Sequence, residues 1–211
     1  MKKLNIQMIL MWIFAILPSI VMGVIYDKIP DKVVIHIGIM GDLRYGSKKM
    51  LWILCMISIF IAIFFVLLKR KNTKKIDDFN NEYYAIGLAI EIFIFGMIII
   101  SILDGFAMNV LPIGNIVIFC SAILFAVVGS VIKNSSNFKP INRWTKMDYD
   151  ILKKTQKFSG KLFIITSLIM AVGTIFATGL TLFILVIVML VCKLILPNVM
   201  SYIWYKERHK K

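Results

Sequence analysis

Long apolar runs alternate with short polar segments along this chain, and most runs are about the length of a membrane-spanning helix. A helix needs about 20 predominantly apolar residues to cross the hydrocarbon core of a bilayer. The first four runs meet this requirement and cover residues 4–26, 50–68, 83–103 and 106–132. The first run follows Lys2 and Lys3 as in a signal peptide, but it is long enough to span and no A-x-A site follows it. We therefore expect it to remain as the first transmembrane helix.

The last apolar run, residues 162–205, is too long for a single crossing. It has 44 residues and one charged side chain, Lys193. A helix of that length measures about 66 Å, which is about twice the thickness of the hydrocarbon core. The run must therefore fold back, and the turn is expected at Ala177, Thr178 and Gly179. The fold class that this pattern predicts is all-α, a polytopic membrane protein with six transmembrane helices.

These runs divide the chain into four parts. The expected parts are a first helix pair with a polar loop at 27–49 (residues 1–68), a second helix pair (69–132), a basic loop with an amphipathic helix (133–161), and a third helix pair with a basic tail (162–211).

Composition and charge place the chain in a membrane and give it a direction. Hydrophobic residues make up 60% of the sequence and the mean hydropathy is +0.87, whereas soluble domains are closer to half apolar. The formal charge of +14 is spread between the apolar runs and forms no single basic domain, which argues against direct nucleic-acid binding. With the N-terminus inside, nineteen Lys and Arg residues fall in inner segments and five in the outer loop at 27–49. The excess of positive charge in inner loops predicts a multi-pass protein of the cell membrane with both termini cytoplasmic.

The first polar segment, residues 26–49, has the pattern of a short strand. Val33, Ile35 and Ile37 alternate with Val34, His36 and Gly38, as expected for an extended segment. An ordinary connector at the membrane surface remains the alternative.

The second polar segment, residues 133–161, has the pattern of a basic amphipathic helix. Thr145 and Asp148 have the spacing of a capping box. Apolar positions such as Ile151 and Phe158 recur at near-helical spacing beside several lysines, which predicts a helix lying on an anionic inner leaflet. A surface helix that only fixes the orientation of the chain is the alternative.

Residues in both polar segments resemble the signatures of SdpI-like membrane proteins. In the first segment the resemblance rests on Pro30, His36, Gly41, Tyr45, Gly46, Ser47 and Lys48. Around the second it rests on Gly129, Ser130, Asn137, Ile141, Arg143, Trp144, Thr145, Thr155, Phe158, Gly160 and Lys161. The length and the six-span layout also agree.

The resemblance implies a function in immunity. Proteins of that family protect a producing cell from its own secreted killing peptide, and the founding member also signals inward by holding a repressor at the membrane. By this resemblance the first set of residues faces the toxin peptide. Within the second set, the cytoplasmic signature comprises Asn137, Arg143, Trp144, Thr145, Thr155, Phe158 and Gly160. The implied partners are membrane lipid, the toxin peptide and a cytoplasmic repressor.

No residue pattern of an enzyme accompanies these features. His36 lies in a loop and His209 in the C-terminal tail, and no P-loop, dinucleotide fingerprint or nucleophile motif occurs. The three cysteines lie inside apolar runs without metal or disulfide spacing. We therefore expect no catalytic site, no metal and no cofactor.

Two charged residues lie within the predicted spans, Glu91 in the third and Lys193 in the sixth. Charges at this depth are costly, and they are usually paired or functional. The expected depths are about 12 Å and about 18 Å from the inner ends of their helices. These depths predict an ion pair between the two. The alternatives are a small secondary transporter that uses these charges, and a structural membrane subunit.

Overall fold

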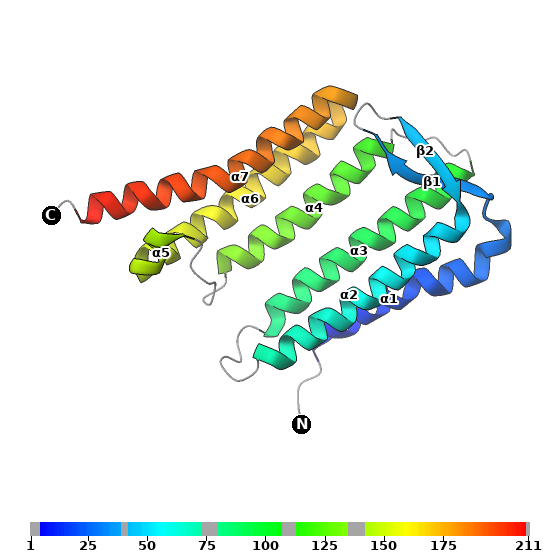
Figure 1. The fold of residues 1–211 in the computed structure, drawn as a ribbon, viewed down its shortest axis with the longest axis horizontal. Coiled ribbons are helices and arrows are strands. Elements are labelled where there is room, and N and C mark those ends of the chain that lie inside the picture. Colours follow the sequence, from blue (N-terminus) through cyan, green and yellow to red (C-terminus); the bar gives the residue numbers. More distant parts are fainter. Residues whose placement is uncertain (1–4, 39–41, 73–79, 107–112, 135–141, 210–211) are drawn as a thin grey trace.

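Six long helices dominate the protein (Figure 1). The computed structural model describes residues 5–38, 42–72, 80–106, 113–134 and 142–209. The long helices are α1 (Ile6–Ile25), α2 (Leu51–Asn72), α3 (Asn80–Gly105), α4 (Ile113–Asn134), α6 (Tyr149–Phe176) and α7 (Gly179–Arg208). All six are long and apolar enough to cross a membrane, so the predicted all-α, six-span architecture is confirmed.

The shorter elements lie at the ends of these helices. They are η1 (Tyr26–Lys28), β1 (Lys32–Ile37), β2 (Leu43–Ser47), η2 (Lys48–Met50) and α5 (Arg143–Met147). The strands form a hairpin at one end of the molecule, where the turn between α6 and α7 also lies. We call this the hairpin end. The start of α1, α5 and the end of α7 lie at the opposite end, which we call the terminal end.

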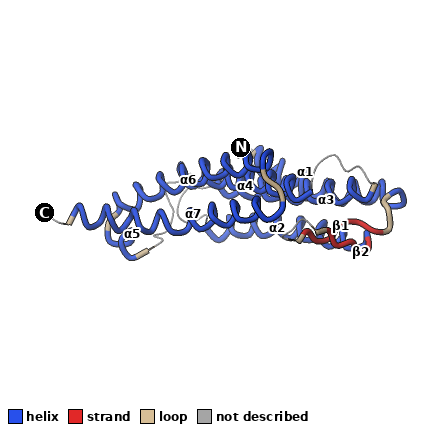
Figure 2. Tube along the Cα trace, turned by 90° about the horizontal axis from the view of Figure 1, so that it is seen from above, coloured by secondary structure: helices blue, strands red, loops and turns tan. Residues whose placement is uncertain are grey.

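The helices form two groups that meet between α3 and α4. Helices α1, α2 and α3 pack together beneath the hairpin, and α6 packs against both α4 and α7. Turned by 90°, the molecule is much thinner than it is wide (Figure 2). In the first group the core consists of two apolar clusters. One lies toward the hairpin and includes Met22, Val33, Leu51, Ile94 and Ile98, and the other includes Met11, Ala15, Ala62, Phe65 and Tyr84.

Close glycine contacts join α4 to α6. A Cβ atom on Gly160 would lie 2.5 Å from the backbone nitrogen of Lys133, and one on Gly129 would lie 2.9 Å from the carbonyl oxygen of Gly160. The two backbones therefore approach as closely as small residues allow, which is a common way for helices to pack in membranes.

The turn between α6 and α7 is where the sequence predicts it. Helix α6 ends at Phe176 and α7 begins at Gly179, whose φ of 53° suits a residue without a Cβ atom. The side-chain amide of Asn115 on α4 donates to the carbonyl oxygens of Thr174 (2.6 Å) and Ala177 (2.9 Å). Carbonyl groups that the end of α6 would leave unpaired are thus satisfied.

The predicted strand is confirmed, but its simple alternation is not. Strands β1 and β2 are antiparallel, with Val34 opposite Tyr45 and His36 opposite Arg44. The register shifts between Val34 and His36, which makes Ile35 the extra residue of a β-bulge. Val33 and Val34, which precede the bulge, are both buried although they are adjacent in the strand, Val33 in the apolar cluster nearer the hairpin and Val34 at the cavity described below.

Two other expectations, which concern where elements begin, are corrected. The fourth span begins at Ile113, since Phe106 follows the end of α3. The amphipathic segment is the first part of the continuous helix α6 and not a separate surface helix, because Ile151, Leu152 and Thr155 are buried within the protein.

The predicted capping box at Thr145 and Asp148 is also wrong. The cap of α5 is Asn142, whose side chain accepts from the backbone N–H of Thr145, while the Thr145 hydroxyl accepts from the backbone N–H of Asn142. Asp148 instead caps α6.

Candidate functional site

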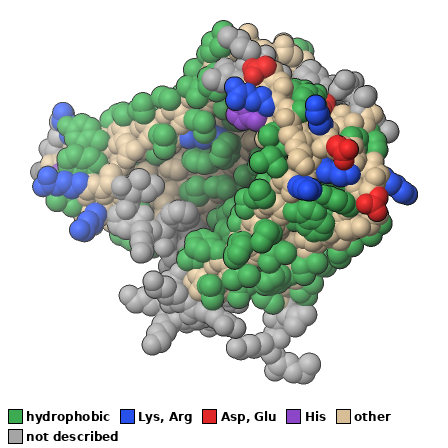
Figure 3. Space-filling view, turned by 45° about the vertical axis from the view of Figure 1, so that its right-hand side comes forward, with side chains coloured by type: hydrophobic (Ala, Val, Ile, Leu, Met, Phe, Trp, Pro, Cys, Tyr) green, Lys and Arg blue, Asp and Glu red, His purple; other side chains and the backbone are tan. Residues whose placement is uncertain are grey.

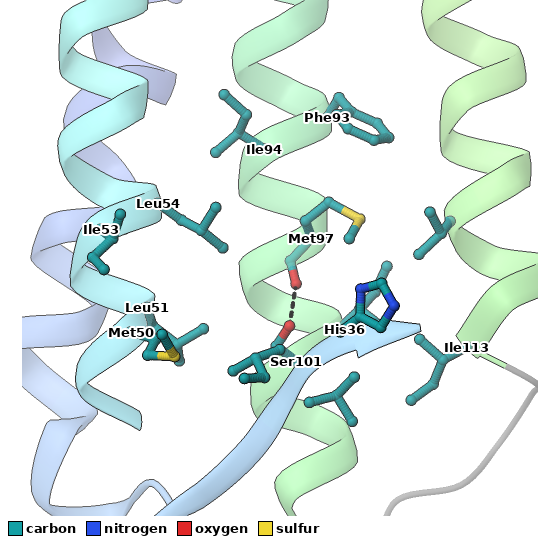
Figure 4. Close-up of a pocket in the computed structure, with 14 residues that line it drawn as sticks. His36, Met50, Leu51, Ile53, Leu54, Phe93, Ile94, Met97, Ser101 and Ile113 are labelled. Atoms are coloured by element: carbon teal, nitrogen blue, oxygen red, sulfur yellow. Dashed lines mark hydrogen bonds between the residues drawn. The ribbon is translucent and has the colours of Figure 1, made fainter. Parts of the chain in front are cut away.

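An apolar cavity of about 560 Å³ opens at the hairpin end (Figure 4). It lies between β1, the start of α2, the second half of α3 and the first turns of α4. Its volume falls in the range of about 300–1,000 Å³ that is typical of small-molecule sites. Most of its wall is apolar, with Leu54, Phe93, Met97, Ile113 and Val117 as examples.

Polar groups are few in this cavity. His36 of β1 lines it and is itself exposed. The Ser101 hydroxyl donates to the carbonyl oxygen of Met97 at 2.9 Å and is thus engaged by its own helix. In Figure 3 the surface is hollowed between the two helix groups, with a histidine and a basic side chain together at its upper rim. The cavity therefore suits an apolar ligand group, with polar contacts available at its mouth.

Lys48 fastens the hairpin to the end of α1. Its ammonium group donates to the carbonyl oxygen of Ile29 at 2.9 Å, pairs with the carboxylate of Asp31 at 3.2 Å, and lies 4.9 Å from the centroid of the Tyr26 ring. Lys48 is therefore a structural residue of the hairpin end.

Three further residues of the first signature also shape the hairpin. Ile35 occupies the space that a Cβ atom on Gly46 would need, with 2.6 Å between that atom and Cδ1 of Ile35. The hydroxyl of Ser47 accepts from the backbone N–H of Lys49 and caps η2. Pro30 lies close to Gly105 at the end of α3. These three residues thus help to position the hairpin, whose strand β1 lines the cavity.

His36 and Tyr45 are the members of this signature that present their side chains outward. Tyr45 is 52% exposed. Partial burial and the nearby carboxylate of Asp104 raise the pKa of the Tyr45 phenol above its ordinary value. The remaining member, Gly41, lies outside the described residues. The structure therefore separates the first signature into residues that build the hairpin and residues that a ligand could meet.

At the terminal end, α5 is held against α7. The Trp144 ring lies 5.1 Å from the ring centroids of both Tyr202 and Tyr205. The side-chain amide of Asn142 donates to Asn198 (2.9 Å) and to Ser201 (2.8 Å). We call these contacts the α5 clamp.

A second set of contacts joins α6 to α7 beside the clamp. Arg208 pairs with Asp148 at 3.2 Å and with Asp150 at 2.9 Å. The rings of Trp204 and Phe158 form a T-shaped pair with 5.7 Å between centroids, and the ammonium group of Lys154 lies 4.4 Å from the centroid of the Trp204 ring. The ends of the two helices are thus tied through ion pairs and aromatic contacts.

Most of the second signature is therefore structural. Trp144, Thr145 and Phe158 take part in these contacts, and Gly160 in the contact between α4 and α6. Thr155 is buried, Arg143 is exposed, and Asn137 lies outside the described residues. Of the described members, Arg143 is the one whose side chain a soluble partner could readily meet.

The predicted ion pair between Glu91 and Lys193 is wrong. Glu91 lies in the first helix group, fully buried, and accepts a hydrogen bond from the hydroxyl of Ser58 on α2. Lys193 lies in the second group, where its ammonium group is 3.9 Å from the centroid of Phe125 and 3.9 Å from the sulfur of Met170. The two residues have similar expected depths, but they do not meet because their helices belong to different groups.

Reasoning from the sequence missed the partners of these two charges. Ser58, Phe125 and Met170 are ordinary residues of apolar helices, so the sequence offers no signal for them. The aromatic positions 202, 204 and 205 near the end of α7 could have indicated the clamp, because they gather at one helix end next to the basic tail. Among the described residues, no group of three or more His, Cys, Asp or Glu side chains could hold a metal ion.

A comparison with known protein families finds a match that overlaps the second signature from position 142 onward. Residues 142–201, which run from the cap of α5 through most of α7, match the SdpI/YfhL protein family. No curated protein and no solved structure matches the chain. The protein is thus a membrane protein with six apolar helices, and its residues 142–201 are similar to the SdpI/YfhL protein family.

Proposed function

We propose that this protein is an immunity protein of the cell membrane that protects its cell from a secreted killing peptide. The observation that carries the proposal is the cavity beneath the hairpin, which offers an apolar site in a chain with an SdpI-like segment. The charge distribution supports the orientation that this function needs. The hairpin loop holds five Lys and Arg residues, against nineteen in the segments assigned to the inside.

A peptide arriving from outside would meet the hairpin first. His36 and Tyr45 are exposed there and can form hydrogen bonds with it. An apolar side chain of the peptide would enter the cavity between Phe93, Met97 and Val117. Full burial of one large apolar side chain contributes about 1.5–3 kcal/mol. This is enough to anchor a peptide that the membrane already concentrates at its surface.

Inward signalling would use the terminal end. Arg143 and the lysines at the start of α6 are exposed there, on a platform that the α5 clamp holds in place. A cytoplasmic repressor with an acidic surface would fit this platform. This second role is separable from protection.

A survival assay tests the proposal. The wild-type chain is expressed in a peptide-sensitive cell, and the cells are challenged with secreted killing peptides. We expect survival to rise with the wild-type chain and to fall when His36→Ala and Tyr45→Ala are combined, because the peptide loses its polar contacts at the mouth of the cavity.

The matched control is Ile63→Ala on α2, which removes an apolar side chain outside the cavity. It should leave protection unchanged while the protein accumulates normally. If no challenge peptide is neutralised by wild-type protein at normal membrane levels, the immunity function is wrong.

A further inference from the structure

Three lysines lie close together where the end of α4 packs beside the first half of α6 (Figure 1). Lys157 and Lys161 are four residues apart and therefore lie on one face of α6. Lys133 is in the last turn of α4, and its Cβ atom is 2.5 Å from the position that a Cβ atom on Gly160 would occupy. Gly160 adjoins Lys161 and lies three residues after Lys157, so the three flexible side chains can reach one ligand. We call these lysines the three-lysine patch.

The positive charge of this patch is not neutralised by the helices that form it. All three lysines are exposed, and none of the ion pairs among the described residues involves them. Helix α4 contains no acidic residue, and α6 contains only Asp150, which pairs with Arg208. The patch can therefore hold a negatively charged group.

An apolar strip continues from the patch along the same face of α6. Its residues follow Lys161 at steps of three or four, as neighbours on one helical face do. They are Ile165, Leu168, Val172 and Ile175, and each is more than half exposed. A ligand that lies along this face thus meets positive charge at one end and apolar side chains along the rest of its length.

The depth of the patch in the membrane indicates what kind of anion it meets. Counted from the end of α6 at Phe176, Lys161 and Lys157 lie about 23 Å and about 29 Å along the helix axis. When the turn after α6 is level with one boundary of the hydrocarbon core, Lys157 is at the opposite boundary and Lys161 is about 7 Å inside it. The flexible stem of a lysine lets its charge reach the boundary from such a depth. The charges then lie at the level of lipid headgroups, and the apolar strip lies at the level of the acyl chains.

We propose that Lys133, Lys157 and Lys161 bind the phosphate of an anionic phospholipid whose acyl chains lie along the apolar strip of α6. A soluble phosphate compound has no chains to cover the strip. Lys153 lies one turn further from the hydrocarbon and stays available to a cytoplasmic partner. The inference does not depend on protection or on inward signalling, because lipid and purified protein are enough to test it.

Three probes separate the possible ligands. Phosphatidylglycerol and phosphatidylcholine with the same acyl chains, and glycerol phosphate without chains, are titrated into the purified full-length protein in a neutral detergent. Native mass spectrometry counts the bound molecules. We expect phosphatidylglycerol to bind at least about tenfold more tightly than phosphatidylcholine, whose choline group offsets the phosphate charge. Equal binding of the two lipids, or binding of glycerol phosphate as tight as that of phosphatidylglycerol, would overturn the proposal.

Equal losses of charge at two places locate the site. Lys157→Gln combined with Lys161→Gln should weaken the binding of phosphatidylglycerol about twenty-fivefold, since each lysine near an anionic lipid raises affinity about fivefold. Adding Lys133→Gln should weaken it about fivefold more. The matched control combines Lys146→Gln with Lys206→Gln, which removes the same charge from exposed lysines of α5 and of the last turn of α7. It should change the affinity by less than about threefold, because salt screens charges that are further from the lipid. Equal losses in the two pairs would indicate a diffuse attraction and overturn the site.

A variant that keeps the charge separates binding from folding. Lys157→Arg combined with Lys161→Arg should retain the preference for phosphatidylglycerol, and unfolding temperatures are measured for all variants. A loss of binding as large with arginine as with glutamine would overturn the proposal. Neither result would bear on the survival assay, which measures protection by the wild-type chain.

Discussion

Lys48 and Trp144 show how single residues of a signature can serve the fold. The family resemblance places Lys48 among the residues that face the toxin peptide and Trp144 in the cytoplasmic signature, whereas in the structure both side chains make contacts within the chain. Lys48 holds the hairpin to the end of α1, and Trp144 holds α5 to α7. The neighbouring residue Arg143 is exposed. Adjacent residues of one motif therefore have different roles, and mutation can separate them.

We expect Trp144→Ala to lower the stability of the protein and Arg143→Ala to leave it nearly unchanged. Two aromatic contacts of about 0.5–1.5 kcal/mol each are lost with Trp144, which gives a loss of about 1–3 kcal/mol. An exposed substitution such as Arg143→Ala usually stays within about 0.5 kcal/mol. Thermal unfolding in detergent measures both, and equal losses would contradict the clamp.

Among the elements, α4 and α6 have glycines that lie against the backbone atoms of the partner helix. Gly129 and Gly160 face the partner backbone directly. In contrast, Gly23 of α1 has nothing within 4 Å of the position where a Cβ atom would lie. The same substitution at these sites should therefore have opposite effects.

Gly160→Ala should destabilise the protein by about 1–3 kcal/mol, because the added methyl group forces two backbones apart. Gly23→Ala should be neutral or stabilise it by up to about 1 kcal/mol, since alanine is the better helix former. Unfolding temperatures of both variants in detergent provide the check. A destabilised Gly23→Ala together with an unchanged Gly160→Ala would mean that the helices do not cross at these glycines.

The helices could be predicted from the sequence, whereas most of their contacts could not. The length of each apolar run determines how many times it crosses, so six spans and the turn before Gly179 follow directly. The bulge at Ile35 was not predictable, because the alternation of apolar residues in β1 gives no sign of an extra residue. The separation of Glu91 from Lys193 depends on which helices pack together, and a hydropathy pattern carries no information about neighbours. The cavity likewise exists only after α2, α3 and α4 meet.

On the scale of the whole molecule, the cavity and the α5 clamp lie at opposite ends. The cavity opens at the hairpin end, and the α5 clamp lies at the terminal end. If the hairpin end is outside, a ligand and a cytoplasmic partner approach opposite ends of the protein.

Cysteine labelling tests this orientation. Ser47 in β2 and Lys153 in α6 are both exposed, and each is replaced by cysteine in a chain from which Cys55, Cys120 and Cys192 are removed. The excess of positive charge at the terminal end predicts that a membrane-impermeant thiol reagent labels position 47 in intact cells. Position 153 should react only after the cells are opened. The reverse result would invert the protein and remove the outward-facing site.

The lengths of α6 and α7 determine how far this helix pair extends beyond the hydrocarbon core of the membrane. They contain 28 and 30 residues, which corresponds to about 42 Å and about 45 Å of helix. The hydrocarbon core is only about 30 Å thick. With their turn level with one boundary of the core, the other ends of this helix pair extend about 12–15 Å beyond the opposite boundary. The α5 clamp, which contacts α7 between Asn198 and Tyr205, then lies about 28–39 Å from the turn and so at the level of that opposite boundary. The last residues of α7 extend beyond it, where a large soluble protein can bind without inserting into the lipid.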